Sequence, residues 1–168
     1  VSDAMSEQTP EFLFRFDLDQ AIRHQLIQKL ENAQSVDLAK GVGPRESGVY
    51  ALYRRGTLVY VGKATKEMTK SKRDLRTRLN EHVGKISNSR GISLKDMTVR
   101  YLTFESEWWV FAAEYALITH FSPSWNNSGF GAKVPGRGRP GTEKVSVWDT
   151  MFPPKGPEDE PEIEESED

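Results

Sequence analysis

Apolar residues recur along this chain with two periods, and these periods predict its elements. One face at helical spacing is formed by Ala21, Ile22, Leu26, Ile27 and Leu30, and Asp17 or Asp19 can cap the start of that helix. Glycine and proline break the pattern at 40–47. The remaining pattern predicts a strand over 48–53, a strand over 58–64, a helix over 72–84, a strand over 98–104 and a helix over 105–121.

The first two strands form a hairpin, and its register decides where two tyrosines lie. A two-residue loop at Arg55 and Gly56 turns Tyr50 and Tyr60 to opposite faces, because a slip of one residue reverses every side chain. A three-residue loop over 54–56 pairs Tyr50 directly with Tyr60 and places Gly56 where a positive φ is needed. The second register also pairs Leu52 with Leu58 and Val49 with Val61. We therefore expect the three-residue loop.

Composition bounds the class of protein. A length of 168 residues suits one domain with flanking segments. No apolar run is long enough to cross a membrane, and the first residues lack the apolar stretch of a signal peptide. The chain has no cysteine, which excludes disulfides. We therefore expect a cytoplasmic protein with no membrane partner.

Charge is distributed unevenly, although the net charge is only −2. Residues 158–168 hold eight acidic residues and no basic residue. The stretch 40–144 holds 19 basic against 9 acidic residues, a net charge of +10. A basic body with an acidic tail favours a polyanionic partner, although an ordinary solvated surface would show the same charges.

A few polar residues at defined spacings suggest phosphodiester chemistry. Tyr50 and Tyr60 lie on neighbouring strands, and Arg78 and His82 are four residues apart, hence on one helical face. With a metal-binding carboxylate, they would supply a proton acceptor and a cation for developing charge. Taken separately, paired tyrosines are typical of cross-strand packing, and Arg78 and His82 of a solvated helix. Asn126 follows the last helix, where asparagine is also a common turn residue.

Glu114 interrupts an apolar helical stripe that includes Val110 and Leu117. A buried carboxylate is costly unless it is paired or bound to a metal. The stripe therefore predicts either a metal ligand or a structural salt bridge to Arg78 or Arg100. The histidines lack a paired metal-ligand spacing, so we expect no zinc site.

Taken in order, these motifs resemble the GIY-YIG nuclease superfamily. Gly48-Val49-Tyr50 and Tyr60-Val61-Gly62 resemble its two signatures, with valine in place of isoleucine. Three further segments follow in the family's order: LRTRLNEH over 75–82, AEYALI over 113–118 and PSWN over 123–126. His82 and the segments 129–131, 135–139 and 148–149 extend the likeness to the type II restriction endonuclease branch, which includes dimers that cut GC-rich palindromes.

The resemblance implies an α/β fold in which helices flank a small three-stranded antiparallel sheet. This chain would add an N-terminal helix and an irregular C-terminal extension. The expected divisions are a disordered arm or tag over 1–15, a helical extension over 16–45, the nuclease core over 46–127, a DNA-contacting extension over 128–154 and an acidic disordered tail over 155–168.

The resemblance also implies the chemistry, which is metal-dependent hydrolysis of DNA to 5′-phosphate and 3′-hydroxyl ends. Mg²⁺ would be the cofactor, and Mn²⁺ can substitute. Glu114 would hold the metal and Arg78, rather than Arg76, would stabilise charge on the phosphate. Tyr60 would orient water or phosphate, and Asn126 would bind the phosphate or brace Glu114.

Tyr50 is expected to be the general base. A free tyrosine has a pKa of about 10. Tyr50 would therefore need nearby cations that lower its pKa, or would have to pass its own proton onward as it acts. His82 could receive that proton, or simply hydrogen-bond Tyr50.

Recognition of DNA needs further residues. Arg137 and Arg139 on the Gly/Pro-rich loop are candidates for reading guanines, although that loop is equally typical of a flexible linker. Lysines and one arginine near the second signature are expected to contact the phosphate backbone: Lys63, Lys66, Lys70, Lys72 and Arg73.

The resemblance thus implies a sequence-specific endonuclease of the restriction type. Its partners would be double-stranded DNA, a second copy of the chain in a homodimer and a companion DNA methyltransferase. Three alternatives stay open: a structure-specific repair nuclease of the same superfamily, a catalytically inactive DNA-binding module and an unrelated protein-interaction domain with a basic face.

Overall fold

The computed structural model describes residues 18–70, 72–131 and 145–159. The arm predicted over 1–15, the candidate guanine readers Arg137 and Arg139, and the end of the acidic tail lie outside these ranges. No helix within the described residues is long and apolar enough to cross a bilayer.

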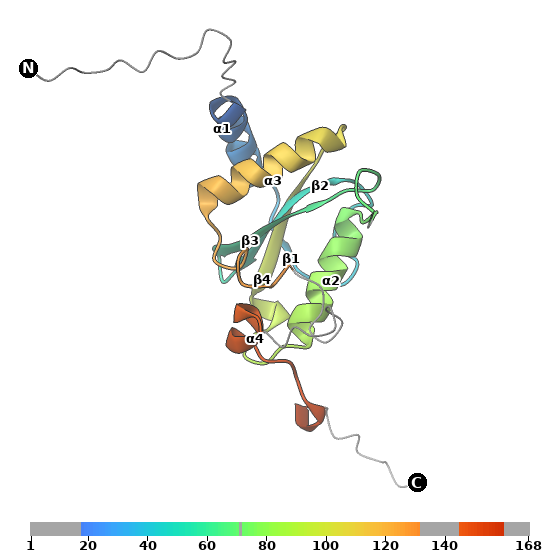
Figure 1. Cartoon of the computed structure of the whole chain (residues 1–168), viewed down its shortest axis with the longest axis vertical. Coiled ribbons are helices and arrows are strands. Elements are labelled where there is room, and N and C mark those ends of the chain that lie inside the picture. The colour runs from blue at the N-terminus through green and yellow to red at the C-terminus, as the bar shows by residue number, and fades with distance from the viewer. Residues whose placement is uncertain (1–17, 71, 132–144, 160–168) are drawn as a thin grey trace, which may run out of the picture.

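A four-stranded antiparallel sheet forms the centre of the α/β fold (Figure 1). Its strands are β1 (Val36–Asp37), β2 (Gly48–Arg54), β3 (Thr57–Ala64) and β4 (Met97–Thr103), in the order β1-β4-β2-β3. The three predicted strands are present, and β1 is an addition that the sequence did not reveal. A strand of two residues shows no period of its own, so only its pairing with β4 identifies it.

Helices cover both faces of the sheet (Figure 1). On one face, α2 (Leu75–Ser87) packs with Tyr50 and Leu52 of the central strand. On the other face, α3 (Glu107–Phe121) packs with Val49 and Ala51, and α1 (Leu18–Glu31) lies beside α3. Because β2 is covered on both sides, it is a nearly continuous apolar run instead of an alternating one.

The helix that carries Arg78 and His82 begins later than the sequence suggested. Asp74 caps α2, because its side chain accepts a hydrogen bond of 2.7 Å from the backbone N–H of Thr77. The first turn is also hydrogen-bonded to the preceding loop. The backbone N–H of Leu75 donates to the carbonyl of Glu46, and that of Arg76 donates to the carbonyl of Pro44. These contacts fix the phase of the helix.

The predicted hairpin register is wrong. A two-residue turn at Arg55 and Gly56 connects the strands, but a bulge then follows, so that Tyr53 pairs with Leu58 whereas Leu52 pairs with Tyr60. The extra residue, Val59, restores the side-chain phase that the two-residue turn would have reversed. Tyr50 consequently pairs with Gly62, and the two tyrosines lie diagonally on one face, with ring centroids 6.1 Å apart.

The C-terminal extension is part of the same core, so residue 127 is not a packing boundary. Phe130, Trp148 and Phe152 are buried against Trp125. Trp148 belongs to a short helix, α4 (Val147–Met151), and its backbone N–H donates to the carbonyl of Ser128 at 2.7 Å.

The first residues of the expected disordered tail are also docked. Two short 3-10 turns, η1 (Leu94–Asp96) and η2 (Pro157–Asp159), complete the described elements. The acidic side chains of η2 pair with Arg90, whose Nε lies 2.7 Å from Asp159 Oδ2 and whose Nη2 pairs with Glu158. The ordered chain therefore continues past the predicted boundary at 155.

Candidate active site

Tyr50 and His82 form the centre of the site. The Tyr50 hydroxyl and His82 Nε2 are 2.7 Å apart, a hydrogen bond between two buried side chains. β2 supplies the tyrosine and α2 supplies the histidine. The sequence placed both residues among its candidates, and the structure brings them into direct contact.

Tyr60 and Phe130 enclose this pair. The rings of Tyr60 and His82 meet edge to face at 5.2 Å, and Phe130 stacks on His82 at 4.6 Å. Gly131 lies so close to Tyr60 that a Cβ there would approach the tyrosine hydroxyl within 2.3 Å. The extension therefore forms one wall of the site, a role for Phe130 that strand and helix periodicity could not indicate.

Lys85 holds that wall in place. Its ammonium donates to the carbonyls of Gly129 and Phe130, at 2.8 and 3.0 Å, and lies over the Phe130 and Trp148 rings. Burial lowers its pKa, although Asp149 opposes the shift. Lys85 is three residues after His82, so its position on the same helical side was the available signal, which our interpretation missed.

Burial determines the protonation states of the two tyrosines. It raises the pKa of Tyr50 well above its ordinary value, and the neighbouring Tyr60 adds to the shift, whereas the Arg78 charge opposes it. The pKa of Tyr60 is raised by burial in the same way. A Tyr50 phenolate formed in advance by nearby cations, one of the two routes left open by the sequence, is therefore disfavoured.

His82 is neutral at physiological pH. Burial, together with the charges of Arg78 and Lys85, lowers its pKa to about 3. An uncharged imidazole has one nitrogen that accepts and one that donates. We assign Nε2 as the acceptor, so that the Tyr50 hydroxyl donates to it.

The lowered histidine pKa predicts acid sensitivity. The unfolded chain takes up a proton on His82 near pH 6.5, whereas the folded chain resists it down to about 3, so stability should fall as the pH drops through this window. At pH 5 the loss relative to pH 7 is expected to be about 2 kcal/mol. Urea unfolding of His82→Gln should lack this component, and the exposed residue His120 offers the control His120→Gln. Equal pH slopes for all three proteins would contradict the assignment.

Gly62 makes room for the tyrosine pair. A Cβ at this position would lie 2.4 Å from the Tyr50 hydroxyl and 2.8 Å from Tyr60 Cε1, and both rings are fixed in the core. The glycine of the second signature is therefore explained by close packing.

Gly62→Ala should destabilise the fold by about 1–3 kcal/mol, because neither ring can move away without strain. Gly84→Ala is the matched control and should stabilise the fold. A Cβ at position 84 meets no atom within 4 Å, and alanine favours the helix over glycine by up to about 1 kcal/mol. Thermal or urea unfolding of the two variants measures the difference, and a stable Gly62→Ala protein would refute the packing account.

Arg78 lies beside both tyrosines. Burial acts to lower its pKa, but Tyr50, Glu81 and Tyr60 outweigh this effect and raise it, so the guanidinium stays charged. Its Nη1 is 2.5 Å from Glu81 Oε2. Arg76 lies elsewhere, because its Nε donates to the carbonyl of Gly43 at 2.8 Å. The structure therefore brings Arg78, and not Arg76, to the tyrosine cluster.

Glu114 reaches the site from the opposite face of the sheet, over the edge strand β3. Its carboxylate pairs with Lys63, so the salt bridge allowed by the sequence exists, but with neither Arg78 nor Arg100. Both side chains keep some exposure, 20% for Glu114 and 30% for Lys63. The negative charge of Glu114 contributes to the raised pKa of Tyr50, which places the carboxylate within electrostatic reach of the cluster.

Asn126 braces the edge strand. Its Oδ1 accepts from the backbone N–H of Val61 at 2.9 Å, and its Nδ2 donates to the Val61 carbonyl at 2.8 Å. Within the described residues its side chain thus binds β3 instead of Glu114. Since β3 is an edge strand, this pairing satisfies backbone groups that no neighbouring strand reaches.

The predicted phosphate contacts divide into two groups. Lys63 is paired with Glu114, Lys66 with Glu46 at 2.9 Å and Arg73 with Glu81 at 3.1 Å. Lys70 and Lys72 are exposed and form no ion pair with another described residue. These two lysines are therefore the better candidates for contact with a phosphate backbone.

The carboxylate of Glu114 suits a hard divalent cation. No group of three or more His, Cys, Asp or Glu side chains in the described part of the chain could enclose a metal. Mg²⁺ does not need such a group, because it is commonly held by one or two carboxylates with water and substrate phosphate. Glu114 keeps 20% exposure, so a cation held in that way could reach its carboxylate.

The cluster of Tyr50, His82 and Arg78 lies on the α2 face of the sheet, and the Glu114 carboxylate of α3 pairs with Lys63 of the edge strand β3. The family model of the Eco29kI GIY-YIG domain matches residues 54–159, more than half of the chain. The chain therefore belongs to this restriction endonuclease family, and it is an endonuclease. The match begins after Tyr50, so it does not include Gly48-Val49-Tyr50.

Solved structures of GIY-YIG domains are also similar. The N-terminal endonuclease domain of UvrC from Thermotoga maritima, bound to its catalytic magnesium, is 22% identical, with a TM-score of 0.35 over 61% of this chain and 96% of that chain. A tyrosine point mutant of the same domain is 21% identical, with a TM-score of 0.37 over the same shares. Both TM-scores are low, and the family assignment rests on the sequence match. No curated protein gives a significant match.

Proposed function

We propose that the chain is a metal-dependent, sequence-specific endonuclease that cuts double-stranded DNA into 5′-phosphate and 3′-hydroxyl ends. The buried hydrogen bond between Tyr50 and His82, beside the charged Arg78, carries the proposal. Membership in the Eco29kI family supports the restriction type.

Tyr50 is the proposed general base, acting through a proton relay. As a water proton moves to the tyrosine oxygen, the tyrosine proton moves to His82 Nε2, so Tyr50 never becomes a free phenolate. With a histidine pKa of about 3, protonating His82 at pH 7 costs about 5 kcal/mol. A turnover of about 10 per second corresponds to a barrier of about 16 kcal/mol, so the relay fits within the barrier of an ordinary enzyme.

The remaining residues position and stabilise the phosphate. Arg78 is proposed to face the charge that develops on the phosphate oxygens, and Tyr60 to orient the water or the phosphate. Glu114 would hold Mg²⁺, for which Mn²⁺ can substitute; when bound, the ion supplies charge stabilisation at the phosphate and the leaving oxygen. Because the metal would then occupy the Glu114 carboxylate, Lys63 would lose this partner. Its ammonium could instead contact a phosphate group of the DNA backbone.

We further propose that two copies of the chain act on a palindrome, each copy cutting one strand. The described part of one chain offers one such site, and a two-fold target mirrors a two-fold protein. Arg137 and Arg139, outside the described residues, stay candidates for reading guanines in a GC-rich site. A companion DNA methyltransferase would protect the host DNA.

The experiment is a digestion of plasmid DNA of known sequence with Mg²⁺, with and without EDTA, followed by mapping of both strands at the cut ends. Defined cuts on both strands at one recurring sequence support the proposal. Nicks that follow branched or damaged DNA would indicate a repair nuclease instead. In a parallel binding measurement on the same DNA, binding without cutting would indicate an inactive module, and the absence of both would argue against a DNA substrate.

A further inference from the structure

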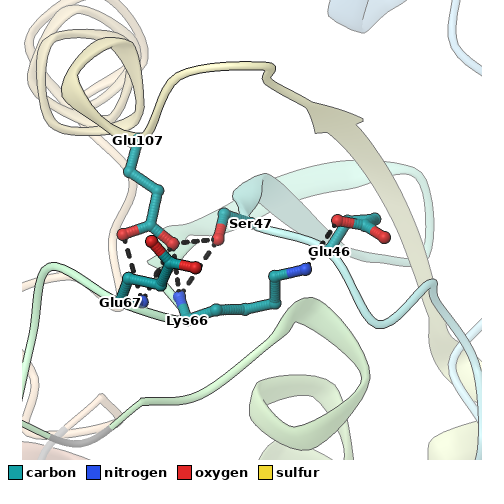
Figure 2. A network of polar contacts seen from close by, with 5 residues as sticks. All are labelled: Glu46, Ser47, Lys66, Glu67 and Glu107. Carbon is teal, nitrogen blue, oxygen red and sulfur yellow. Dashed lines mark hydrogen bonds and ion pairs between the residues drawn. The ribbon is translucent and has the colours of Figure 1, made fainter.

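Glu107, the first residue of α3, binds a segment that follows the second signature. We define the basic loop as residues 65–73, which leave the end of β3 and contain the candidate phosphate contacts. Figure 2 shows the Glu107 carboxylate facing the start of this loop, with Ser47 beside it. Glu107 has no place in the proposed chemistry, so its contacts require a separate account.

The carboxylate accepts hydrogen bonds from three successive backbone N–H groups. The N–H of Lys66 donates to Oε1 at 2.6 Å, that of Met68 donates to Oε2 at 2.7 Å, and that of Glu67 lies between the two oxygens at 3.1 and 3.2 Å. The Ser47 hydroxyl also donates to Oε1. Successive backbone N–H groups of this kind form an anion-binding nest, and here the anion belongs to the protein.

These bonds hold the carboxylate in its ionised form. Burial acts to raise its pKa, but the hydrogen bonds from Ser47 and from the loop backbone outweigh it, and the pKa lies below the ordinary value. A carboxamide could not replace it fully, because one of its two polar ends donates and would face donors.

A second contact closes the base of the basic loop. The backbone N–H of Arg73 donates to the carbonyl of Thr65 at 2.9 Å, so the loop returns to the end of β3. Lys70 and Lys72 lie in the part beyond these anchors, and both are exposed. The base is therefore fixed while the cations project toward solvent.

The same helical face joins the basic loop to the candidate metal ligand. Glu107 and Glu114 are seven residues, or about two turns, apart on α3. Between them, Phe111 lies 5.2 Å from the Lys63 ammonium that pairs with Glu114. One rigid helix thus sets the position of the basic loop relative to Glu114.

We propose that Glu107 is a positioning residue for DNA binding, which holds the basic loop so that Lys70 and Lys72 meet the phosphate backbone while Glu114 meets the scissile phosphate. The proposal rests on the proposed DNA-cleaving function and deepens it. Glu107 touches neither the tyrosine cluster nor the substrate in this account. It acts through the loop backbone.

The first test needs no DNA. Amide hydrogen exchange of residues 66–68 should be slow in the wild-type protein and markedly faster in Glu107→Gln, while amides of β2 keep their protection. Glu105→Gln is the matched control, since Glu105 is exposed and bonds no other described side chain or backbone group. Unchanged protection of these amides in Glu107→Gln would show that Glu107 does not hold the basic loop, and would overturn the proposal. Glu107→Asp, which keeps the charge but shortens the reach, should give intermediate exchange and serves if the glutamine variant does not fold.

The second test measures binding to a short duplex of mixed sequence in EDTA, over a series of salt concentrations. Each lost phosphate contact makes the slope of log Kobs against log salt shallower by about 0.9. If Glu107→Gln loses the contacts of both Lys70 and Lys72, its slope should be shallower than that of the wild-type protein by up to about 2. Combining Glu107→Gln with Lys70→Ala and Lys72→Ala should add little, because the lysines have already lost their position.

Additive effects in that combination would overturn the proposal, since Glu107 would then act independently of the lysines. Tighter binding by Glu107→Gln would also overturn it, because the carboxylate would then be occupying a phosphate site. If the wild-type protein fails to bind the duplex at low salt, the proposed function is wrong, and the exchange data still decide whether Glu107 clamps the loop.

Discussion

Glu114→Gln is expected to bind DNA with nearly wild-type affinity and to lose cleavage by roughly a thousandfold or more. A bound metal supplies several kcal/mol of charge stabilisation in the transition state, and each 1.36 kcal/mol is a factor of ten in rate. The carboxamide keeps the shape of the side chain but lacks the charge that holds the cation. Single-turnover cleavage with Mg²⁺ and binding in EDTA, measured on the same duplex, separate the two effects.

Stability provides the control for this substitution. Glu114 loses its ion pair with Lys63, but both groups are partly exposed, so the free energy of unfolding should change by less than about 1 kcal/mol. A loss of cleavage in a well-folded protein therefore reports chemistry and not unfolding. Metal-dependent cutting by Glu114→Gln at the wild-type rate would remove Glu114 from the metal site.

The local part of the fold was predictable from the sequence. Strands β2, β3 and β4 and helices α2 and α3 lie close to the predicted ranges, and the spacing of four residues correctly placed Arg78 and His82 on one side of α2. The two tyrosines were also correctly predicted to share a face, although for an incorrect reason. The three-residue turn was expected to achieve what the bulge at Val59 does in the structure.

A bulge leaves no mark in a hydrophobic pattern, because it is selected by packing across strands and not by local propensity. The partner of Glu114 was unpredictable for a related reason. Lys63 lies 51 residues away, and its choice over Arg78 and Arg100 depends on how α3 crosses β3. The wall made by Phe130 and Lys85 is likewise non-local, since irregular segments have no period from which their position can be derived.

The proposed role of Arg78 leads to an expected contrast between two arginines on one helix. Removing a preorganised donor that faces developing charge typically costs about 10²-fold in rate or more. Arg78→Ala should therefore reduce single-turnover cleavage by at least about that factor, while duplex binding in EDTA falls much less. The guanidinium lies beside Tyr50 and Tyr60, and its charge influences the pKa of both.

Arg76→Ala provides the matched control, because it removes an equal charge from the same turn of α2. Arg76 donates to the Gly43 carbonyl, so its loss should cost some stability at the helix start and leave the cleavage rate near the wild-type value. Arg78→Lys refines the test, since a lysine keeps the charge but not the planar fork of donors, and should recover only part of the rate. If Arg76→Ala and Arg78→Ala lowered the rate equally, the phosphate would have to lie at another face of α2, and the cluster of Tyr50, His82 and Arg78 would not be the catalytic centre.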